Sequence, residues 1–285
     1  MRMNFLGDKK KNIEIKVGRG STFFIFCLFF LNLTLFPVFT LSNRGKAEEN
    51  KSPTLQKICS FSTWYNPNDV GRCENIALAS SFIDGITVQP YGEFSFNQTV
   101  GKRLAERGFK NAKIILNGAF VKGIGGGVCQ VSTTLYNVAL LSGLTVTEYH
   151  PHSLSVSYVP PSLDAMVSSC HDLRFLNPYE FPIRIKMKTV KSGVIATVYG
   201  LGGTVGTEYK LVSNVLEEIL PPPPLECQEG EQKAQASKKG MKSESYLERY
   251  ENGILVSRKL LRKDVYAPVR EIIVKKIEDT TKKMP

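Results

Sequence analysis

The residues best suited to chemistry lie in the stretch GIGGGVCQVSTT, residues 123–134. Four glycines stand just ahead of Cys129, and the residues after it carry apolar side chains at helical spacing. A cysteine in the first turn of a helix lies at the positive end of the helix dipole, which favours the thiolate. The glycine N–H groups, together with Gln130, could stabilise an oxyanion. The pattern predicts a thiol nucleophile at Cys129.

A nucleophilic cysteine needs a base and a group that orients the base. All three histidines, His150, His152 and His171, follow within a short window. His150 and His152 lie in a run expected to be a strand, where alternate residues face the same side. We therefore predict His150 or His152 as the base, and Asp164 or Asp172 as the carboxylate that orients it.

The glycine-rich stretch has other interpretations. A P-loop requires a lysine directly after the last glycine, and none follows Gly127; the dinucleotide-binding pattern G-x-G-x-x-G is also absent. A buried structural cysteine after a tight turn remains an alternative. No C-x-x-C pair exists and the Cys and His spacing is wide, so no metal site and no cofactor are predicted.

The elements that would position these residues follow from periodicity and turn signals. Helices are predicted over 73–85 and 128–143, and strands over 145–161 and 165–177. Hairpins are predicted to turn at Asn117-Gly118, Ser192-Gly193 and Asn252-Gly253. The expected fold class is α+β, an antiparallel sheet packed with a few helices, one of which bears Cys129.

The chain divides into four predicted segments: a basic N-terminus with an apolar run and a spacer (1–50), a main domain (51–215), a Pro-rich polar linker (216–244) and a small β-rich tail (245–285). The uncharged run from Phe23 to Leu41 is long enough to cross a bilayer and follows a lysine-rich stretch. We expect a single-pass cell-membrane protein with its main domain outside, or a secreted protein if the segment is a cleaved signal peptide.

Charge and cysteine content suit an exported protein. The 285 residues carry a net charge of +11 without a recognisable nucleic-acid-binding motif, so nucleic acid is not an expected partner. Anionic wall polymers or lipid head groups fit the charge better. Beyond the apolar run five cysteines remain, an odd number. A short bridge between Cys59 and Cys73, and a more speculative one between Cys170 and Cys227, would leave Cys129 free.

From about Phe61 to Gly202 the chain resembles the VanW family, named for an accessory protein of vancomycin-resistance clusters. The resemblance rests on FSTWY (61–65), ENIALAS (74–80), GEFSFNQTVG (92–101), GGGVCQVSTTLYNVALLSGL (125–144), HPHSLSVSYVPPSLDAMVS (150–168) and DLRFLNPYEFPIRIKM (172–187). The stretch RYENGILVSRKLLRKDVYAPVREIIV, residues 249–274, is similar to the five-glycine extracellular module.

The resemblance implies a bacterial cell-envelope protein of unestablished activity. It carries the family pattern onto Cys129, Gln130, His150, His152, Asp164 and Asp172. Cys59, Cys73, Cys170 and His171 depart from the family pattern, which favours disulfide roles for those cysteines.

Two functions follow as hypotheses. The first is a Cys/His thiol hydrolase or transpeptidase acting on cell-wall peptide or another envelope amide. The second is a non-catalytic module that binds wall polymer, a lipid-linked precursor or a partner protein. Stacking surface for that role could come from Trp64, Tyr65, Tyr91, Tyr149 and Tyr158.

Overall fold

A computed structural model describes residues 54–116, 118–201, 206–228 and 234–275. The apolar run predicted at 23–41 lies outside these ranges. Within them, no helix combines the length and apolar character needed to cross a membrane.

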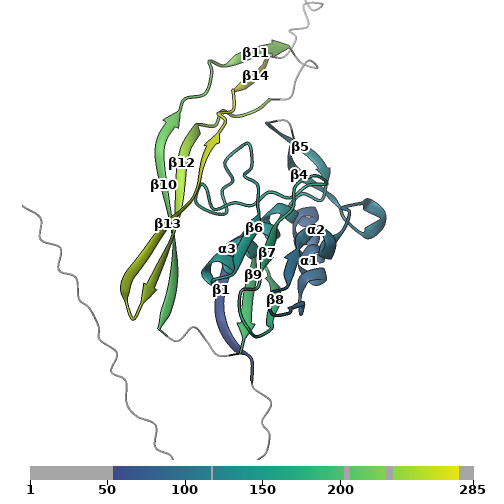
Figure 1. Cartoon of the computed structure of the whole chain (residues 1–285). Coiled ribbons are helices and arrows are strands. Elements are labelled where there is room, and N and C mark those ends of the chain that lie inside the picture. The colour runs from purple at the N-terminus through teal and green to yellow at the C-terminus, as the bar shows by residue number, and fades with distance from the viewer. Residues whose placement is uncertain (1–53, 117, 202–205, 229–233, 276–285) are drawn as a thin grey trace, which may run out of the picture. The chain divides into compact units, whose positions relative to one another are not determined.

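The described residues form many strands and few helices (Figure 1). The helical elements are α1 (Val70–Ile83), α2 (Phe96–Val100), a 3-10 turn (Ala105–Arg107) and α3 (Val128–Leu141). The strands up to residue 200 are β1 (Gln56–Trp64), β2 (Thr87–Val88), β3 (Glu93–Ser95), β4 (Asn111–Leu116), β5 (Ala119–Ile124), β6 (Thr145–Glu148), β7 (Arg174–Leu176), β8 (Ile183–Val190) and β9 (Gly193–Gly200). Those after it are β10 (Thr207–Ile219), β11 (Leu225–Gln228), β12 (Gly240–Glu251), β13 (Ile254–Tyr266) and β14 (Ile272–Lys275).

The largest core lies between a four-stranded sheet and two helices. The sheet has the order β1-β9-β8-β2, and α1 and α3 pack against it and against each other. Strand β8 alternates buried and exposed side chains, as expected of a sheet with one covered face. Helix α3 is buried on nearly all sides, and Val131, Leu135 and Val138 are at most 1% exposed. A helix covered all round holds its first turn in a fixed place.

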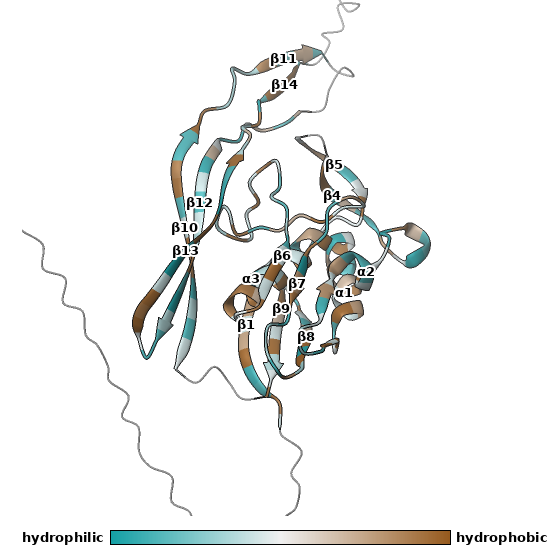
Figure 2. Ribbon diagram, viewed as in Figure 1, coloured by the Kyte–Doolittle hydropathy of each residue, from teal (hydrophilic) through white to brown (hydrophobic). Residues whose placement is uncertain are grey.

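The strands after residue 206 form a second set of sheets. Strands β10, β12 and β13 make an antiparallel sheet, and β11 pairs with β14 in parallel. Asn252 and Gly253, with φ of 50° and 81°, make the turn between β12 and β13. The first residues of β13 at this turn are apolar and exposed, and they appear brown in Figure 2.

The predicted α+β class is wrong, because the structure is mostly β. Fourteen strands in several small sheets stand against three α-helices among the described residues. The error arose largely in the predicted linker and tail. Strand β13 has seven exposed residues in a row, so it lacks the one-sided apolar alternation by which a strand is usually identified. Strand β10 runs through residue 215, where a domain boundary is predicted.

The predicted helices and hairpins agree with the structure where a periodic pattern of side chains ends at a clear turn signal. Both predicted helices are confirmed as α1 and α3, and the three predicted hairpins as β4–β5, β8–β9 and β12–β13. The strand predicted over 145–161 is wrong beyond Glu148, because residues 149–173 form an irregular loop. The expected disulfides are absent: all five cysteines of the described residues are unpaired.

Candidate functional site

The glycine-rich loop is shaped by close backbone packing. Gly127 caps the N-terminus of α3 with φ of 105°, a conformation that favours glycine. A Cβ atom on Gly126 would lie 2.6 Å from the carbonyl oxygen of Lys113 on β4. A larger residue at this position could not bring the loop before α3 this close to β4. The glycines thus place Cys129 in the first turn of a buried helix.

The Cys129 thiol faces the loop of residues 149–173 and has an environment that favours its charged form. Cys129 is partly buried, and its Sγ lies 3.4 Å from the carbonyl oxygen of Val167. Burial alone would raise the pKa of this thiol. The neighbouring imidazole of His152 and the guanidinium of Arg103 outweigh burial and hold the pKa of Cys129 below its ordinary value. The site therefore stabilises a thiolate.

His152 is the histidine that reaches Cys129. Its Nδ1 lies 2.6 Å from Oδ2 of Asp164, and its backbone N–H donates to the same oxygen over 2.8 Å. With Nδ1 engaged by the carboxylate, Nε2 is the ring nitrogen left for the thiol. Burial opposes the charged imidazole, but hydrogen bonding to Asp164 and Cys129 raises the pKa of His152 to about 9. The three side chains form a Cys–His–Asp sequence of contacts.

Asp164 is held from its other side by strand β13. Its Oδ1 accepts from Arg262 over 2.6 Å and also from the hydroxyl of Tyr266. The carboxylate is 1% exposed. Burial alone would raise its pKa, yet His152 and Arg262 lower the pKa of Asp164 to about 2. Asp164 thus remains ionised across the physiological range, and part of its support comes from a strand about a hundred residues later.

Further bonds tie the loop of residues 149–173 to the β10–β12–β13 sheet. The backbone N–H of Ser162 donates to the Tyr266 hydroxyl over 2.8 Å, and Ser245 Oγ donates to the Ser162 carbonyl over 2.8 Å. Ser162 Oγ also lies 2.7 Å from Ser243 Oγ. These bonds are buried, so they fix the loop that carries both His152 and Asp164.

The side-chain amide of Gln130 is fully engaged in hydrogen bonds to neighbouring residues. Its amide nitrogen donates to Thr63 Oγ1 over 2.9 Å and to the Trp64 carbonyl over 3.0 Å. Its Oε1 accepts from Arg72 over 2.7 Å. Because both amide donors are engaged, Gln130 positions Arg72 and the end of β1 rather than presenting a free donor to the thiol.

Two other predicted residues lie away from Cys129. His150 Nε2 lies 3.0 Å from Glu148 Oε1, and its ring packs edge-on against that of His171. The carboxylate of Asp172 accepts from the Ser95 hydroxyl and from the backbone N–H of Asn97. The structure therefore brings together Cys129, His152 and Asp164 but places His150 and Asp172 in separate contacts.

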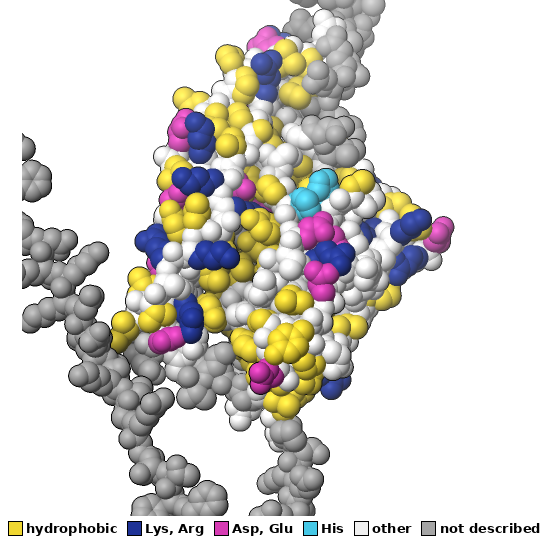
Figure 3. Space-filling view, viewed as in Figure 1, with side chains coloured by type: hydrophobic (Ala, Val, Ile, Leu, Met, Phe, Trp, Pro, Cys, Tyr) yellow, Lys and Arg dark blue, Asp and Glu magenta, His cyan; other side chains and the backbone are white. Residues whose placement is uncertain are grey.

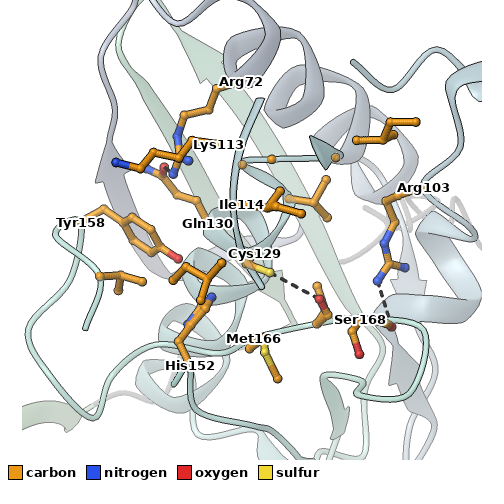
Figure 4. A pocket seen from close by; sticks show the side chains of 18 of the residues that line it. Arg72, Arg103, Lys113, Ile114, Cys129, Gln130, His152, Tyr158, Met166 and Ser168 are labelled. Atoms are coloured by element: carbon orange, nitrogen blue, oxygen red, sulfur yellow. Dashed lines mark hydrogen bonds between the residues drawn. The ribbon is translucent and has the colours of Figure 1, made fainter. Parts of the chain in front are cut away.

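A cavity of about 1000 Å³ opens beside Cys129 (Figure 4). Cys129, Gln130 and His152 line it, together with the glycine-rich loop and the hairpin β4–β5. Its lining aromatic residues are Trp64, Tyr65, Phe120 and Tyr158. Its lining basic residues are Arg72, Lys102, Arg103, Lys113 and Lys238. The cavity is large enough for several residues of a peptide.

The residues that sequence reasoning missed are the basic ones around the cavity and the pair on β13. Arg262 and Tyr266 meet Asp164 across a separation of 98 and 102 residues, which no local pattern signals. Arg72 lies one residue before the helix predicted over 73–85, so that pattern did not indicate it, and the structure places it in α1. Among the described residues no group of three or more His, Cys, Asp or Glu side chains could hold a metal ion.

Comparison with known proteins agrees with the predicted family. Residues 71–199 match the family model described as VanW like protein, and residues 226–275 match the G5 domain model. The "Uncharacterized protein YoaR" of Bacillus subtilis (strain 168) is 42% identical over 147 residues, covering 51% of this chain and 48% of that protein. The "Vancomycin B-type resistance protein VanW" of Enterococcus faecalis (strain ATCC 700802 / V583) is 27% identical over 131 residues, covering 44% and 48%.

The chain thus spans about half the length of the curated relatives it matches. The solved structure titled "Crystal structure of HP0197-G5" covers 24% of this chain and 93% of that chain at 19% identity, with a TM-score of 0.14.

Proposed function

We propose that the VanW-like domain at residues 71–199, together with the strands of the G5-matching region, forms a thiol acyl-transfer site for peptide amides of the cell envelope. The observation that carries this proposal is the buried His152–Asp164 pair beside Cys129 at the start of α3. Raised His152 and lowered Cys129 pKa values support a thiolate–imidazolium pair, the reactive form of a cysteine nucleophile.

In the proposed reaction the Cys129 thiolate attacks an amide carbonyl carbon and forms the S–C bond. The oxyanion would receive a hydrogen bond from the backbone N–H of Cys129, because the N–H groups of Val128 and Gln130 donate to the carbonyls of Gly125 and Gly127. The C–N bond then breaks as His152 gives its proton to the leaving amine. The resulting thioester passes its acyl group to water in hydrolysis or to a second amine in transpeptidation, and His152 takes up the proton of the attacking group.

A generic acyl donor tests this chemistry without a known substrate. The full chain, in mild detergent, is mixed with p-nitrophenyl acetate, and acetylation of each cysteine-containing peptide is followed by mass spectrometry. We expect Cys129 to be acetylated much faster than the exposed thiol of Cys170, and the advantage to be lost in His152→Ala. Acetylation of Cys129 no faster than that of Cys170 would refute the proposal.

The second candidate is a non-catalytic envelope module that binds wall polymer, a lipid-linked precursor or a partner protein. Family membership and the G5 match support it more directly than they support catalysis, because neither description names a reaction. Trp64 is 60% exposed beside the cavity, where it could stack on a sugar or peptide. Under this function Cys129→Ser would still sediment with purified cell wall, and Trp64→Ala would sediment less. Loss of wall binding on Cys129→Ser alone would argue against it.

The place of the protein in the cell is part of the proposal. An envelope location follows from the family, and the apolar run at 23–41 would supply a membrane anchor or a signal peptide. Fractionation of cells followed by N-terminal sequencing of the mature chain distinguishes the two.

A further inference from the structure

The cavity beside Cys129 carries positive charge that nothing in its lining balances. Its basic lining residues are Arg72, Lys102, Arg103, Lys113 and Lys238. No aspartate or glutamate lines it. Cys129 and His152 contribute one negative and one positive charge in their ionised forms, which cancel. The cavity therefore presents an excess of cationic groups to whatever enters it.

These five cations are also unpaired elsewhere. Thirteen ion pairs occur across the described ranges, and none of them includes any of the five. The exterior differs, since Figure 3 shows Lys and Arg interspersed with Asp and Glu over the face bearing β10, β12 and β13. Like charges in a concave site repel one another, and a bound anion would relieve that repulsion.

The cations are held in place by neutral groups. Arg103 donates to Asn97 Oδ1 over 2.7 Å and to the Ser168 carbonyl over 3.0 Å. Arg72 donates to Gln130 over 2.7 Å. Neutral acceptors orient a guanidinium without cancelling its charge. Asp172 lies near enough to Arg103 to favour its charged form, but its carboxylate is engaged by Ser95 and Asn97 and does not line the cavity.

The two lysines at the hairpin add to the same field. The Nζ atoms of Lys113 and Lys238 both lie over the ring of Phe120, at 4.2 and 5.9 Å from its centroid. Burial lowers the pKa of Lys238, and the charge of Lys113 lowers it further. Two ammonium groups brought this close would be relieved by an anion bound between them.

Figure 4 shows how the cations surround the thiol. Arg72 and Lys113 lie on one side of Cys129, and Arg103 lies on the other. We infer that the site selects an anionic acyl donor, a peptide with at least one free carboxylate close to the amide that Cys129 attacks. This inference rests on the proposed thiol chemistry and names the charge of its substrate.

Two alkylating reagents of similar size and different charge test the inference. Iodoacetate and iodoacetamide both transfer a carbon to a thiolate, forming the S–C bond and releasing iodide, but only iodoacetate is an anion. The full chain is treated with each reagent, and the rates at Cys129 and Cys170 are read by mass spectrometry of their peptides. Cys170 is exposed and serves as the internal reference.

We expect the iodoacetate-to-iodoacetamide rate ratio to be at least about tenfold higher at Cys129 than at Cys170. Arg72→Gln and Lys113→Gln should each lower the Cys129 ratio by about three- to tenfold. Lys113 is exposed on β4, so its variant tests the charge without disturbing the Gln130 contacts that Arg72 makes. Lys188→Gln removes an exposed charge on β8, outside the cavity, and should leave the ratio unchanged.

The outcomes separate the inference from the function on which it rests. A reactive Cys129 whose ratio equals that of Cys170, or does not respond to Arg72→Gln and Lys113→Gln, would overturn the anionic preference and leave the thiol chemistry standing. A Cys129 inert to both reagents would refute the thiol chemistry and the inference together.

Discussion

Replacing Asp164 with asparagine tests whether the carboxylate creates the reactive thiol. The substitution keeps the shape of the side chain and removes its charge. In the native protein hydrogen bonding to Asp164 is the strongest effect that opposes burial and raises the pKa of His152 to about 9. Without that carboxylate only Cys129 still opposes burial, so the His152 pKa should fall to about the ordinary histidine value of 6.5. A fall of about 2.5 units corresponds to roughly 3 kcal/mol.

A lower His152 pKa should in turn raise the pKa of Cys129. A neutral His152 no longer stabilises the thiolate, so the pKa of Cys129 should rise above the free-cysteine value of about 8.5. At pH 6.5 such a thiol is only about 1% ionised, and its alkylation by iodoacetamide should be about tenfold slower or more than in the native protein.

The assay combines two measurements over pH 5 to 10. The ring signals of His152 are followed by NMR, assigned with His152→Gln, and the alkylation rate of Cys129 is followed by mass spectrometry. Asp84→Asn is the matched control, because Asp84 also forms an ion pair, at 3.3 Å to Lys186, but lies outside the cavity. Unchanged titration midpoints in a folded Asp164→Asn protein would show that Asp164 does not tune this site.

Further predictions concern stability. Arg262→Gln should lower the free energy of unfolding by about 3 to 5 kcal/mol, because it leaves the buried Asp164 charge with one partner fewer. The exposed Lys263→Gln should lower it by less than about 1 kcal/mol. Urea unfolding measures both. The pKa of Asp164 is lowered to about 2. Its charge should therefore add about 2 to 3 kcal/mol to the free energy of unfolding above about pH 4, and this contribution should be lost as the pH falls toward 2. Acid unfolding of Asp164→Asn beside the native protein checks this. Gly126→Ala should lower the melting temperature more than Gly118→Ala. An added Cβ on Gly126 meets a backbone oxygen at 2.6 Å, whereas on Gly118 it meets nothing within 4 Å and only the φ of 72° opposes it.

The position of the candidate site is easier to identify from the sequence than the arrangement of the sheets. Cys129 was identifiable because its signal is local: glycines, a cysteine and an apolar helical repeat in one short stretch. The sequence alone does not distinguish His150 from His152, because a regular strand puts both on one side. The loop of residues 149–173 instead turns His152 to Asp164 and leaves His150 with Glu148. Irregular backbone held by side-chain bonds has no periodicity to detect.

The long strands after residue 206 were harder to predict for a different physical reason. In β10 and in the first half of β13 no side chain is buried, so these segments lack an alternating apolar pattern although they pair with β12 along their length. Arg262 looked like one basic residue among several in LLRKD. Its partner Asp164 is 98 residues away, and only the folded chain places them together.

The contact between β13 and Asp164 bears on modularity. The two family models match separate regions of this chain, one ending at residue 199 and the other beginning at residue 226, as if these were independent domains. The boundary passes between a carboxylate and the cation that neutralises it. If the first region were fused to another tail, Asp164 would be buried without these partners. The new tail would have to supply a guanidinium and a phenol at the positions of Arg262 and Tyr266. In this chain the buried carboxylate of the first matched region therefore depends on the second region for its partners.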